Sequence, residues 1–321
     1  MLHDIRSMVA QLIPVHFSPQ VPHHRVEAIL QGTLADNLHF CHAQETWVVV
    51  DAGSVAEGLF REARAGSPLF GLNLLVLPVN RGKTGAIRAG LSWVLAESRA
   101  RYFVTRDCDG DSRIEDLPRL VLLAEAMPAE APRSVFGCRP SLAKPMTWER
   151  LQWEALTNQV FFDLVSYLLA ASARTLIKNF WNQPTLDLQS GYRLYDREAA
   201  TIAARSLTEL PDEREIYLLA CEVSPFIEIT LAGGQIGQVY RSTQVEQPVS
   251  SYAALDFARY YGRLLRHYAL HYGAPVPLIR QMFDNGLVES DGLQSGLREQ
   301  LLECRRIIDP DSPELSRPPL L

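Results

Sequence analysis

A chain of 321 residues with a formal net charge of −6 is long enough to bury the core of one large domain or of two ordinary ones. Its 47% hydrophobic and 21% charged residues are typical of a soluble globular protein. The acidic balance argues against a protein that mainly binds nucleic acid, because such proteins normally carry a basic surplus. A local basic pocket for a small anion remains compatible with this balance.

The N-terminal segment gives no sign of secretion. Its apolar runs are short and are interrupted by Asp4, Arg6 and Gln11, and no small-residue cleavage pattern follows. The five cysteines are odd in number and scattered, without the CxxC or His pairing of a zinc site, and are expected to be reduced thiols. Both features predict a cytoplasmic protein.

The most apolar long segment, residues 160–180, is expected to be a buried amphipathic helix. It carries Asp163, Arg174 and Lys178, and these charges oppose a transmembrane span. We therefore expect no transmembrane segment, and any membrane contact would be peripheral, at the inner face. A later helical segment from residue 252, rich in tyrosine and arginine, could lie on such a surface, although this spacing is more typical of an ordinary packed helix.

Strands and helices alternate over the first part of the chain. Residues 46–52, 72–79 and 101–107 are short runs rich in Val, Leu or aromatic residues, whereas residues 55–65 and 84–99 show helical spacing. Such alternation predicts an α/β fold with a mostly parallel central sheet flanked by helices.

Two of these predicted strands end in acids, Asp51 and Asp107. An isolated acid at a strand end could simply open a turn, as Asp51 could with Gly53 and Ser54. In open parallel sheets, however, ligands bind in the crevice at the carboxyl ends of the strands. We therefore expect Asp51 and Asp107 to project into one crevice.

The rest of the chain is expected to complete the sheet and then become helical. Residues 133–139 predict a strand ending at Arg139, and residues 147–180 have helical spacing. Residues 226–233 and 237–243 predict a late β-hairpin, because two strand-like runs are separated by glycines.

The last part of the chain predicts a helical extension and a tail. Helical spacing resumes at residue 252, and the Pro-rich, polar residues 309–321 are expected to be disordered. We predict three parts, a sheet domain at 1–250, the extension at 251–308 and the tail at 309–321.

Gly82, Lys83 and Thr84 before a predicted helix raise the question of a P-loop. A P-loop requires a glycine five residues before the Gly-Lys pair, because its backbone N–H groups wrap the phosphates, and position 77 is Leu. The P-loop is therefore excluded. Lys83, together with Arg81 and Arg88, could face solvent or reach a phosphate.

Asp107, Asp109 and Asp111 alternate directly after a predicted strand. Carboxylates this close repel one another unless a cation, protons or solvent compensates, so a divalent metal is expected, and oxygen-only ligands suit Mg²⁺ or Mn²⁺ better than zinc. An EF-hand loop is excluded, because Ser112 and Pro118 stand where it requires Gly and Glu. The alternative is a solvated acidic turn before the next helix.

Several strings now form a pattern in their order and spacing. VVVDAGS, NRGKTGAIRAGL, YFVTRDCDGD, GCR and DLQSGYRLYD resemble the successive signatures of family-2 glycosyltransferases with the GT-A fold, nearest the polyprenyl-phosphate mannosyl- and glucosyltransferases. The resemblance covers roughly residues 10 to 245 and implies an inverting hexosyltransferase that uses Mg²⁺ or Mn²⁺ and a UDP- or GDP-sugar.

The resemblance also implies residues for the donor. Asp51 matches the acid that binds the nucleotide base, and Lys83 lies in the segment that flanks the nucleotide. Asp107 and Asp109 match the DxD pair that holds the metal and the donor diphosphate, and Asp111 stands where some relatives supply another ligand. The phosphate-binding arginines would be Arg139 and Arg150.

On the acceptor side the resemblance implies a segment with Asp187, Ser190, Gly191 and Arg193, together with Glu215. An alcohol acceptor would require a carboxylate to take its proton, and Asp187 and Glu215 are the candidates. A phosphate acceptor is already ionised and needs no base, and Arg193 would then serve as a phosphate clamp.

Two departures from the family keep alternatives open. The segment 12–25 lacks the Asn-Glu pair that contacts the nucleotide in relatives, which leaves a catalytically silent sugar-nucleotide-binding protein as one alternative. The chain also has no clear membrane anchor, so a soluble acceptor competes with polyprenyl phosphate. A sugar-phosphate nucleotidyltransferase is a further alternative, but its glycine-rich, basic N-terminal loop has no match in residues 14–25, which contain no glycine.

Overall fold

The computed structural model describes residues 2–139, 147–170, 174–181, 187–208, 210, 220–242, 256–289 and 295–311. The chain forms two compact units, of which the first comprises Met1–Pro145 with Ile177–Val249 and the second Met146–Leu176 with Ser250–Leu321. The second unit thus joins a segment from the middle of the chain to the C-terminal segment. The predicted boundaries at 250 and 308 remain predictions.

Unit 1 is built on one seven-stranded sheet with the order β3-β2-β1-β4-β6-β5-β7. The strands are β1 Val9–Val15, β2 Thr46–Val50, β3 Asn73–Val76, β4 Tyr102–Thr105, β5 Arg133–Cys138, β6 Arg193–Asp196 and β7 Gln235–Tyr240. β6 runs antiparallel to both of its neighbours and the other pairs are parallel. The predicted mostly parallel sheet is confirmed.

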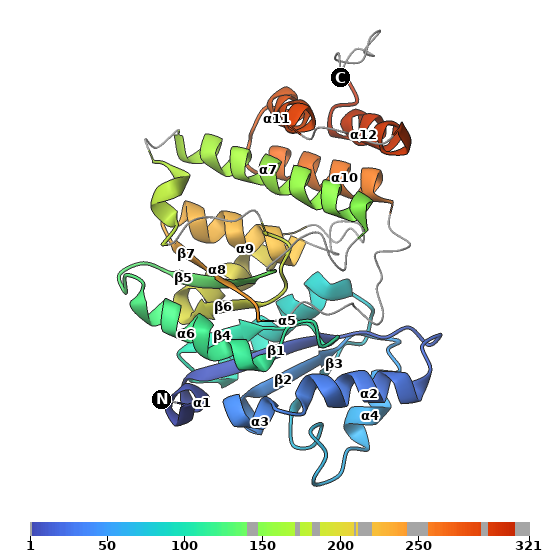
Figure 1. Ribbon diagram of the computed structural model, residues 1–321, viewed down its shortest axis with the longest axis vertical. Coiled ribbons are helices and arrows are strands. Elements are labelled where there is room, and N and C mark those ends of the chain that lie inside the picture. The colour runs from blue at the N-terminus through green and yellow to red at the C-terminus, as the bar shows by residue number, and fades with distance from the viewer. Residues whose placement is uncertain are drawn as a thin grey trace. The chain divides into compact units, whose positions relative to one another are not determined.

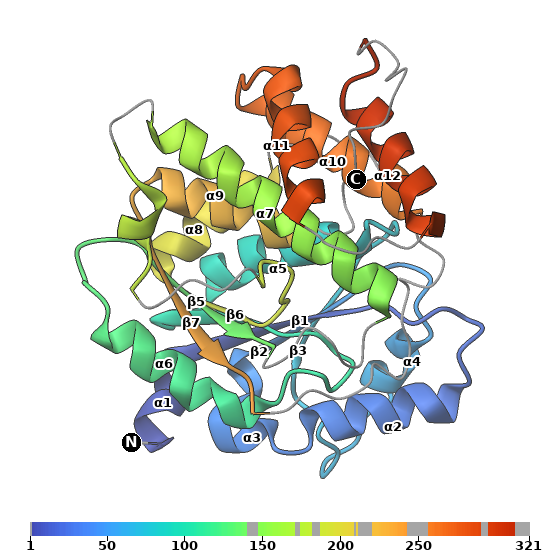
Figure 2. The same ribbon diagram turned by 45° about the horizontal axis from the view of Figure 1, so that its top comes forward.

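Helices cover both faces of this sheet (Figures 1 and 2). They are α1 Leu2–Met8, α2 His23–Leu34, α3 Asn37–Phe40, α4 Ala56–Arg61, α5 Gly82–Glu97, α6 Leu117–Ala126, α8 Arg197–Thr208 and α9 Ala220–Leu231, with short 3₁₀ helices η1 Ala43–Glu45, η2 Ile114–Asp116 and η3 Leu176–Asn179. α5, α8 and α9 lie on one face, and α2, α3, α4 and α6 on the other.

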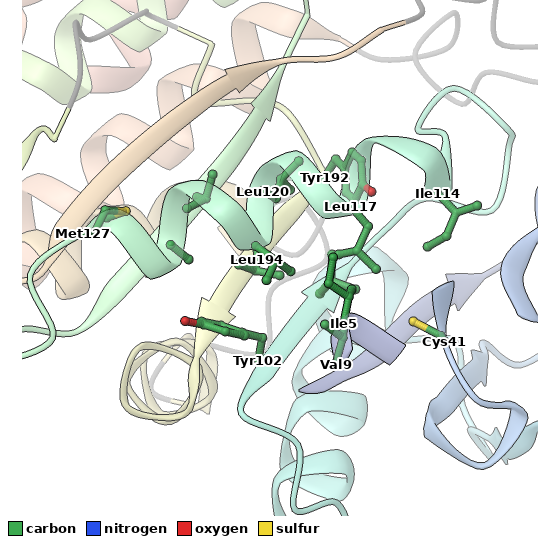
Figure 3. Close-up of a cluster of buried hydrophobic side chains, with 14 residues drawn as sticks. Ile5, Val9, Cys41, Tyr102, Ile114, Leu117, Leu120, Met127, Tyr192 and Leu194 are labelled. Carbon is green, nitrogen blue, oxygen red and sulfur yellow. The ribbon is translucent and has the colours of Figure 1, made fainter. Parts of the chain in front are cut away.

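The core explains why these segments adopt their structures. β1, β2 and β4 are buried along their whole length, as expected for parallel strands covered on both faces. On one face, Gly90 lets α5 approach β1 closely, since a Cβ there would lie 2.3 Å from Leu12 Cδ1. On the other face, an apolar cluster joins α6 to β1, β4 and β6 (Figure 3), and Val9, Tyr102 and Leu194 belong to it.

The predicted late hairpin is wrong. Residues 226–231 belong to α9, so β7 has no hairpin partner there and pairs in parallel with β5 instead. Phe226, Ile227, Ile229 and Thr230 are all buried, so the segment shows no helical alternation, and its β-branched residues resemble those of a strand. A short apolar run of this kind cannot be assigned by periodicity alone.

Unit 2 is helical, with α7 Trp148–Ala170, α10 Phe257–His271, α11 Val276–Glu289 and α12 Ser295–Ile308. Trp153 of α7 stacks on Tyr261 of α10 with ring centroids 5.6 Å apart. Gly262 lets α12 approach α10, because a Cβ there would lie 2.9 Å from Ile307 Cβ. The predicted helical extension is confirmed, and α7 joins it. Most of the predicted tail, residues 312–321, lies outside the described residues.

Candidate active site

The acids predicted to share a crevice follow the two strands that flank β1, β2 and β4, at the same edge of the sheet. β1 pairs with β2 on one side and β4 on the other, so the direction of strand addition reverses at β1. Asp51 directly follows β2, and its N–H donates to the Val15 carbonyl at the end of β1 (2.9 Å). Asp107 follows β4 by two residues. Such a switch point is where open α/β sheets bind ligands.

Asp51 is buried, and only one of its oxygens is satisfied. Oδ1 accepts hydrogen bonds from the N–H of Ala52 (3.1 Å) and from the N–H of Arg81 (2.8 Å), which ties the turn after β3 to the end of β2. Oδ2 is buried and has no hydrogen-bond partner among the described residues. An unmatched buried acceptor costs about 1–3 kcal/mol, so this oxygen suits a donor that arrives with a ligand.

Lys83 bridges two carboxylates from distant parts of the chain. Its Nζ lies 2.8 Å from Asp107 Oδ1 and 2.8 Å from Glu222 Oε1 on α9. Burial raises the pKa of Glu222, an effect that the positive charge of Lys83 opposes. Gly191 closes over the Lys83–Asp107 pair, because a Cβ there would lie 2.5 Å from Asp107 Oδ2 and 2.8 Å from Lys83 Nζ.

The acidic loop, residues 107–112, is a tight turn in which the three acids have different partners. Gly110 has a φ of 81°, which permits the turn, and Asp109 Oδ1 accepts the N–H of Asp111 (3.1 Å). Asp111 Oδ2 accepts from Nη1 of Arg241, which follows β7, at 2.9 Å. Burial and the charge of Asp107 raise the pKa of Asp109 to about 6.

A buried arginine fixes this loop to the sheet domain. Arg106 is 1% exposed and donates to the carbonyls of Ser112 (3.1 Å) and Thr33 (2.9 Å) and to Asn37 Oδ1 (3.3 Å). Directly after the loop, Ile114 and Leu117 pack into the apolar cluster of Figure 3. Both ends of the acidic loop are therefore anchored.

Asp107 and Asp109 fit a divalent cation that is held together with the phosphate groups of a ligand. Within the described residues, no three His, Cys, Asp or Glu side chains form a metal centre by themselves. Asp107 and Asp109 nevertheless lie close enough for the charge of one to raise the pKa of the other, and a cation would relieve this repulsion. Mg²⁺ is commonly held by one or two carboxylates together with substrate phosphates. Asp111 Oδ2 is paired with Arg241 as Asp107 is with Lys83, and the buried Oδ1 of Asp111 has no hydrogen-bond partner among the described residues.

Arg139 and Asp187 form a buried ion pair in unit 1. The N–H and Nε of Arg139 donate to Asp187 Oδ2 (2.7 and 3.1 Å), and Nη2 donates to Oδ1. Burial alone would raise the pKa of Asp187, but the charge and hydrogen bonds of Arg139 hold that pKa below its ordinary value. Asp187 is therefore a weak proton acceptor in this arrangement.

The guanidinium of Arg193 donates its hydrogen bonds to main-chain carbonyls of the protein. Its guanidinium is 1% exposed, donates to the carbonyls of Leu188, Ser190 and Glu222, and lies 4.2 Å above the ring of Phe136. These contacts join the loop before β6 to α9. In this position Arg193 stabilises the loop. A residue that binds the phosphate of an acceptor, as predicted, would instead need an exposed guanidinium.

Two further predicted site residues are not among the described residues of unit 1. Arg150 lies on α7 in unit 2, where its Nε donates to Glu154 Oε1 at 2.7 Å. Glu215 lies outside the described residues. The predicted roles of both stay predictions.

Glu222 and Arg241 belong to the site but were missed in the sequence. Glu222 lies four residues before the predicted hairpin, and it meets Lys83 across 139 positions of the chain. Arg241 lies in the predicted second hairpin strand and meets Asp111 across 130 positions. No local pattern signals either contact, although an acid within an apolar run, such as Glu222, is a reason to look for a buried partner.

Comparison with known proteins establishes the fold. Glucosyl-3-phosphoglycerate synthase from Mycobacterium tuberculosis, solved with Mn²⁺, UDP and phosphoglyceric acid, is 14% identical, over 86% of this chain and 84% of that one, with a TM-score of 0.50. The same synthase with Mg²⁺ and UDP gives 12% identity, the same coverage and a TM-score of 0.50. A mannosyltransferase from Pyrobaculum calidifontis, solved with GDP-Man and Mn²⁺, is 14% identical over 96% of this chain and 88% of that one, with a TM-score of 0.49.

No protein-family model matches the sequence, and no curated protein matches it. Among the helices that the structure describes, none is both long and apolar enough to span a bilayer. The likeness to the solved synthase confirms the predicted GT-A fold, with its mixed, mostly parallel sheet between helices.

Proposed function

We propose that this protein is an inverting, metal-dependent glycosyltransferase that moves a sugar from a UDP- or GDP-sugar to polyprenyl phosphate or a soluble acceptor. The observation that carries the proposal is the gathering of Asp51, Lys83, Asp107 and Asp109 at the carboxyl edge of the sheet, where the strand order reverses. The synthase of the same fold was solved with Mn²⁺ and UDP.

Asp51 would bind the nucleotide base. Its buried Oδ2 requires a hydrogen-bond donor, and the ring N–H of uracil or guanine is such a donor. Oδ1 is meanwhile held by two backbone N–H groups, so the carboxylate is fixed in place before the ligand arrives. A preorganised acceptor of this kind favours bases that present an N–H on the edge facing it.

Asp107 and Asp109 would hold Mg²⁺ or Mn²⁺ together with the donor diphosphate. The bound cation supplies charge stabilisation as the sugar–phosphate bond breaks and negative charge develops on the leaving diphosphate. Lys83 adds a positive charge beside Asp107, within reach of the same group. Gly191 leaves no room for a side chain here, so a larger residue would displace Lys83 or Asp107.

The state of Asp187 favours an acceptor that is already ionised. A carboxylate whose pKa is lowered by a buried arginine takes a proton from an alcohol poorly. A phosphate acceptor needs no such step. We therefore propose that Asp187 positions Arg139, and that Arg193 positions the loop before β6, whereas a base for an alcohol acceptor would have to come from Glu215.

A catalytically silent sugar-nucleotide-binding protein is the second candidate. It is favoured by the missing Asn-Glu pair after β1 and by the cations that already pair with Asp107 and Asp111. Such a protein would bind the nucleotide with the same residues but would not turn the donor over.

The test is a thermal-shift panel of UDP-, GDP- and dTDP-sugars, each with and without Mn²⁺. A ligand at 100 times its dissociation constant stabilises a protein by about 2.7 kcal/mol, which corresponds to a shift on the order of 5 °C. We expect a metal-dependent shift with one base that is lost in Asp109→Ala and kept in Asp36→Ala, which removes an exposed acid. No shift with any nucleotide contradicts the proposal. Binding without donor hydrolysis or transfer favours the silent alternative.

A further inference from the structure

Lys83 is shared unequally between its two carboxylates. The side chain of Asp107 is 24% exposed, whereas that of Glu222 is 3% exposed. Asp107 can therefore exchange Lys83 for water or for a bound cation at small cost. Glu222 is a buried acid, and a buried carboxylate that loses its counter-ion is strongly destabilised. Lys83 is consequently tied to Glu222 more firmly than to Asp107.

The two contacts of Lys83, with Asp107 and with Glu222, affect metal binding in different ways. The Nζ of Lys83 contacts both oxygens of Asp107, at 2.8 Å (Oδ1) and 3.0 Å (Oδ2). An ammonium in that position competes with any divalent cation for the same carboxylate. The contact with Glu222 Oε1, at 2.8 Å, gives Lys83 a place to remain when Asp107 turns to the cation.

We propose that Glu222 is a positioning residue that holds the ammonium group of Lys83, a residue of α5, against α9. Asp107 is then available to bind the metal and its donor diphosphate. The inference rests on the proposed function, because it takes Asp107 to be a metal ligand. It adds a residue that the sequence pattern does not assign. Thr84 supports the arrangement, since its Oγ1 accepts the N–H of Cys221 (3.1 Å) and so joins the first turn of α5 to α9 beside Glu222.

Three substitutions separate this role from a simple effect of charge. Glu222→Gln keeps the shape but removes the charge, so Lys83 is drawn to Asp107, and the affinity for Mn²⁺ alone should fall about tenfold. Glu222→Asp keeps the charge but withdraws it by one methylene, which breaks the 2.8 Å contact. We expect a similar fall for Glu222→Asp. Lys83→Met removes the competitor, and in that background Glu222→Gln should change Mn²⁺ affinity less than twofold.

The measurement is a titration with Mn²⁺ alone, in which electron paramagnetic resonance follows the free ion. The matched control is Glu228→Gln, which makes the same charge change on the same helix, and it should leave Mn²⁺ affinity within twofold of the parent protein. Thermal melts of each variant show whether it is folded. If Glu222→Gln does not fold, Glu222→Asp in the two Lys83 backgrounds gives the same comparison.

The outcomes are distinguishable. A fall in both Glu222 variants that disappears in Lys83→Met supports the inference. A fall in Glu222→Gln that is equal in both backgrounds, with Glu222→Asp unchanged, shows a general effect of charge and refutes it. Lower melting temperatures with unchanged Mn²⁺ affinity refute it as well. If the parent protein binds neither Mn²⁺ nor any nucleotide, the proposed metal site itself fails, and the inference fails with it.

Discussion

Replacing Asp187 by Asn tests whether this acid is a structural partner or a catalytic base. Asp187 and Arg139 have side chains only 3% and 7% exposed, so neither charge is screened by solvent. The substitution removes the buried negative charge to which Arg139 donates three hydrogen bonds. Breaking a buried pair in this way costs about 3–5 kcal/mol, far more than the loss of a surface pair. We expect the free energy of unfolding to fall by about that amount.

Urea unfolding of four proteins measures this effect. Asp187→Asn and Arg139→Gln should each be strongly destabilising, whereas the double variant should recover at least half of the loss, because no charge then remains unpaired. The pH dependence gives a second check. The folded pKa of Asp187 is lowered, so its contribution is present above the unfolded value of about 4 and is lost as pH falls through the folded pKa. A loss below 1 kcal/mol in Asp187→Asn, with no recovery in the double variant, would refute the reasoning.

Three shorter predictions concern the crevice. Gly191→Ala should weaken the binding of donor and Mn²⁺ together, measured by calorimetry, because the added methyl displaces Lys83 or Asp107, and Gly32→Ala, which meets nothing within 4 Å, is the control. The raised pKa of Asp109 means that the metal-free protein should lose stability as pH rises from about 4 to about 6, while Mn²⁺ affinity rises over the same range, and Asp109→Asn should remove both trends. Arg106→Met should cost about 3 kcal/mol in urea unfolding, because it leaves two buried carbonyls unsatisfied, and Arg106→Lys should recover part of this loss.

The strands were predictable because local composition and topology agree. The runs at 46–52 and 101–107 are too short and too rich in β-branched or aromatic residues to be ordinary helices, and parallel pairing then forces Asp51 and Asp107 to one edge. α9 was not predictable in this way. Its described part is buried on nearly every side, so tertiary contacts decide its conformation and its periodicity carries no signal.

The individual side chains of the site were less predictable than their position in the fold. The sequence shows that Arg193 and Asp187 occupy positions typical of an acceptor segment, but it does not show whether their charges are free. In the structure Arg193 is satisfied by three carbonyls, and Asp187 is satisfied by Arg139. Glu222 was missed because its partner Lys83 is 139 residues away in the sequence, so no local pattern signals the contact.

The pairing of Asp187 with Arg139 also bears on the chemistry of the acceptor. If Asp187 were the base, Asp187→Asn would abolish transfer to any alcohol while leaving donor binding intact, and the rate in the parent protein would rise with pH through the pKa of that acid. If Asp187 instead positions Arg139, the variant should lose both stability and affinity for the phosphate that Arg139 is predicted to bind, and Arg139→Gln should reproduce both losses. Inorganic phosphate, which is already an anion at neutral pH and carries no alcohol hydroxyl, is a direct probe. A calorimetric titration in which phosphate binds the parent protein but neither variant supports the positioning role, whereas equal binding by all three assigns the phosphate-binding groups to other residues.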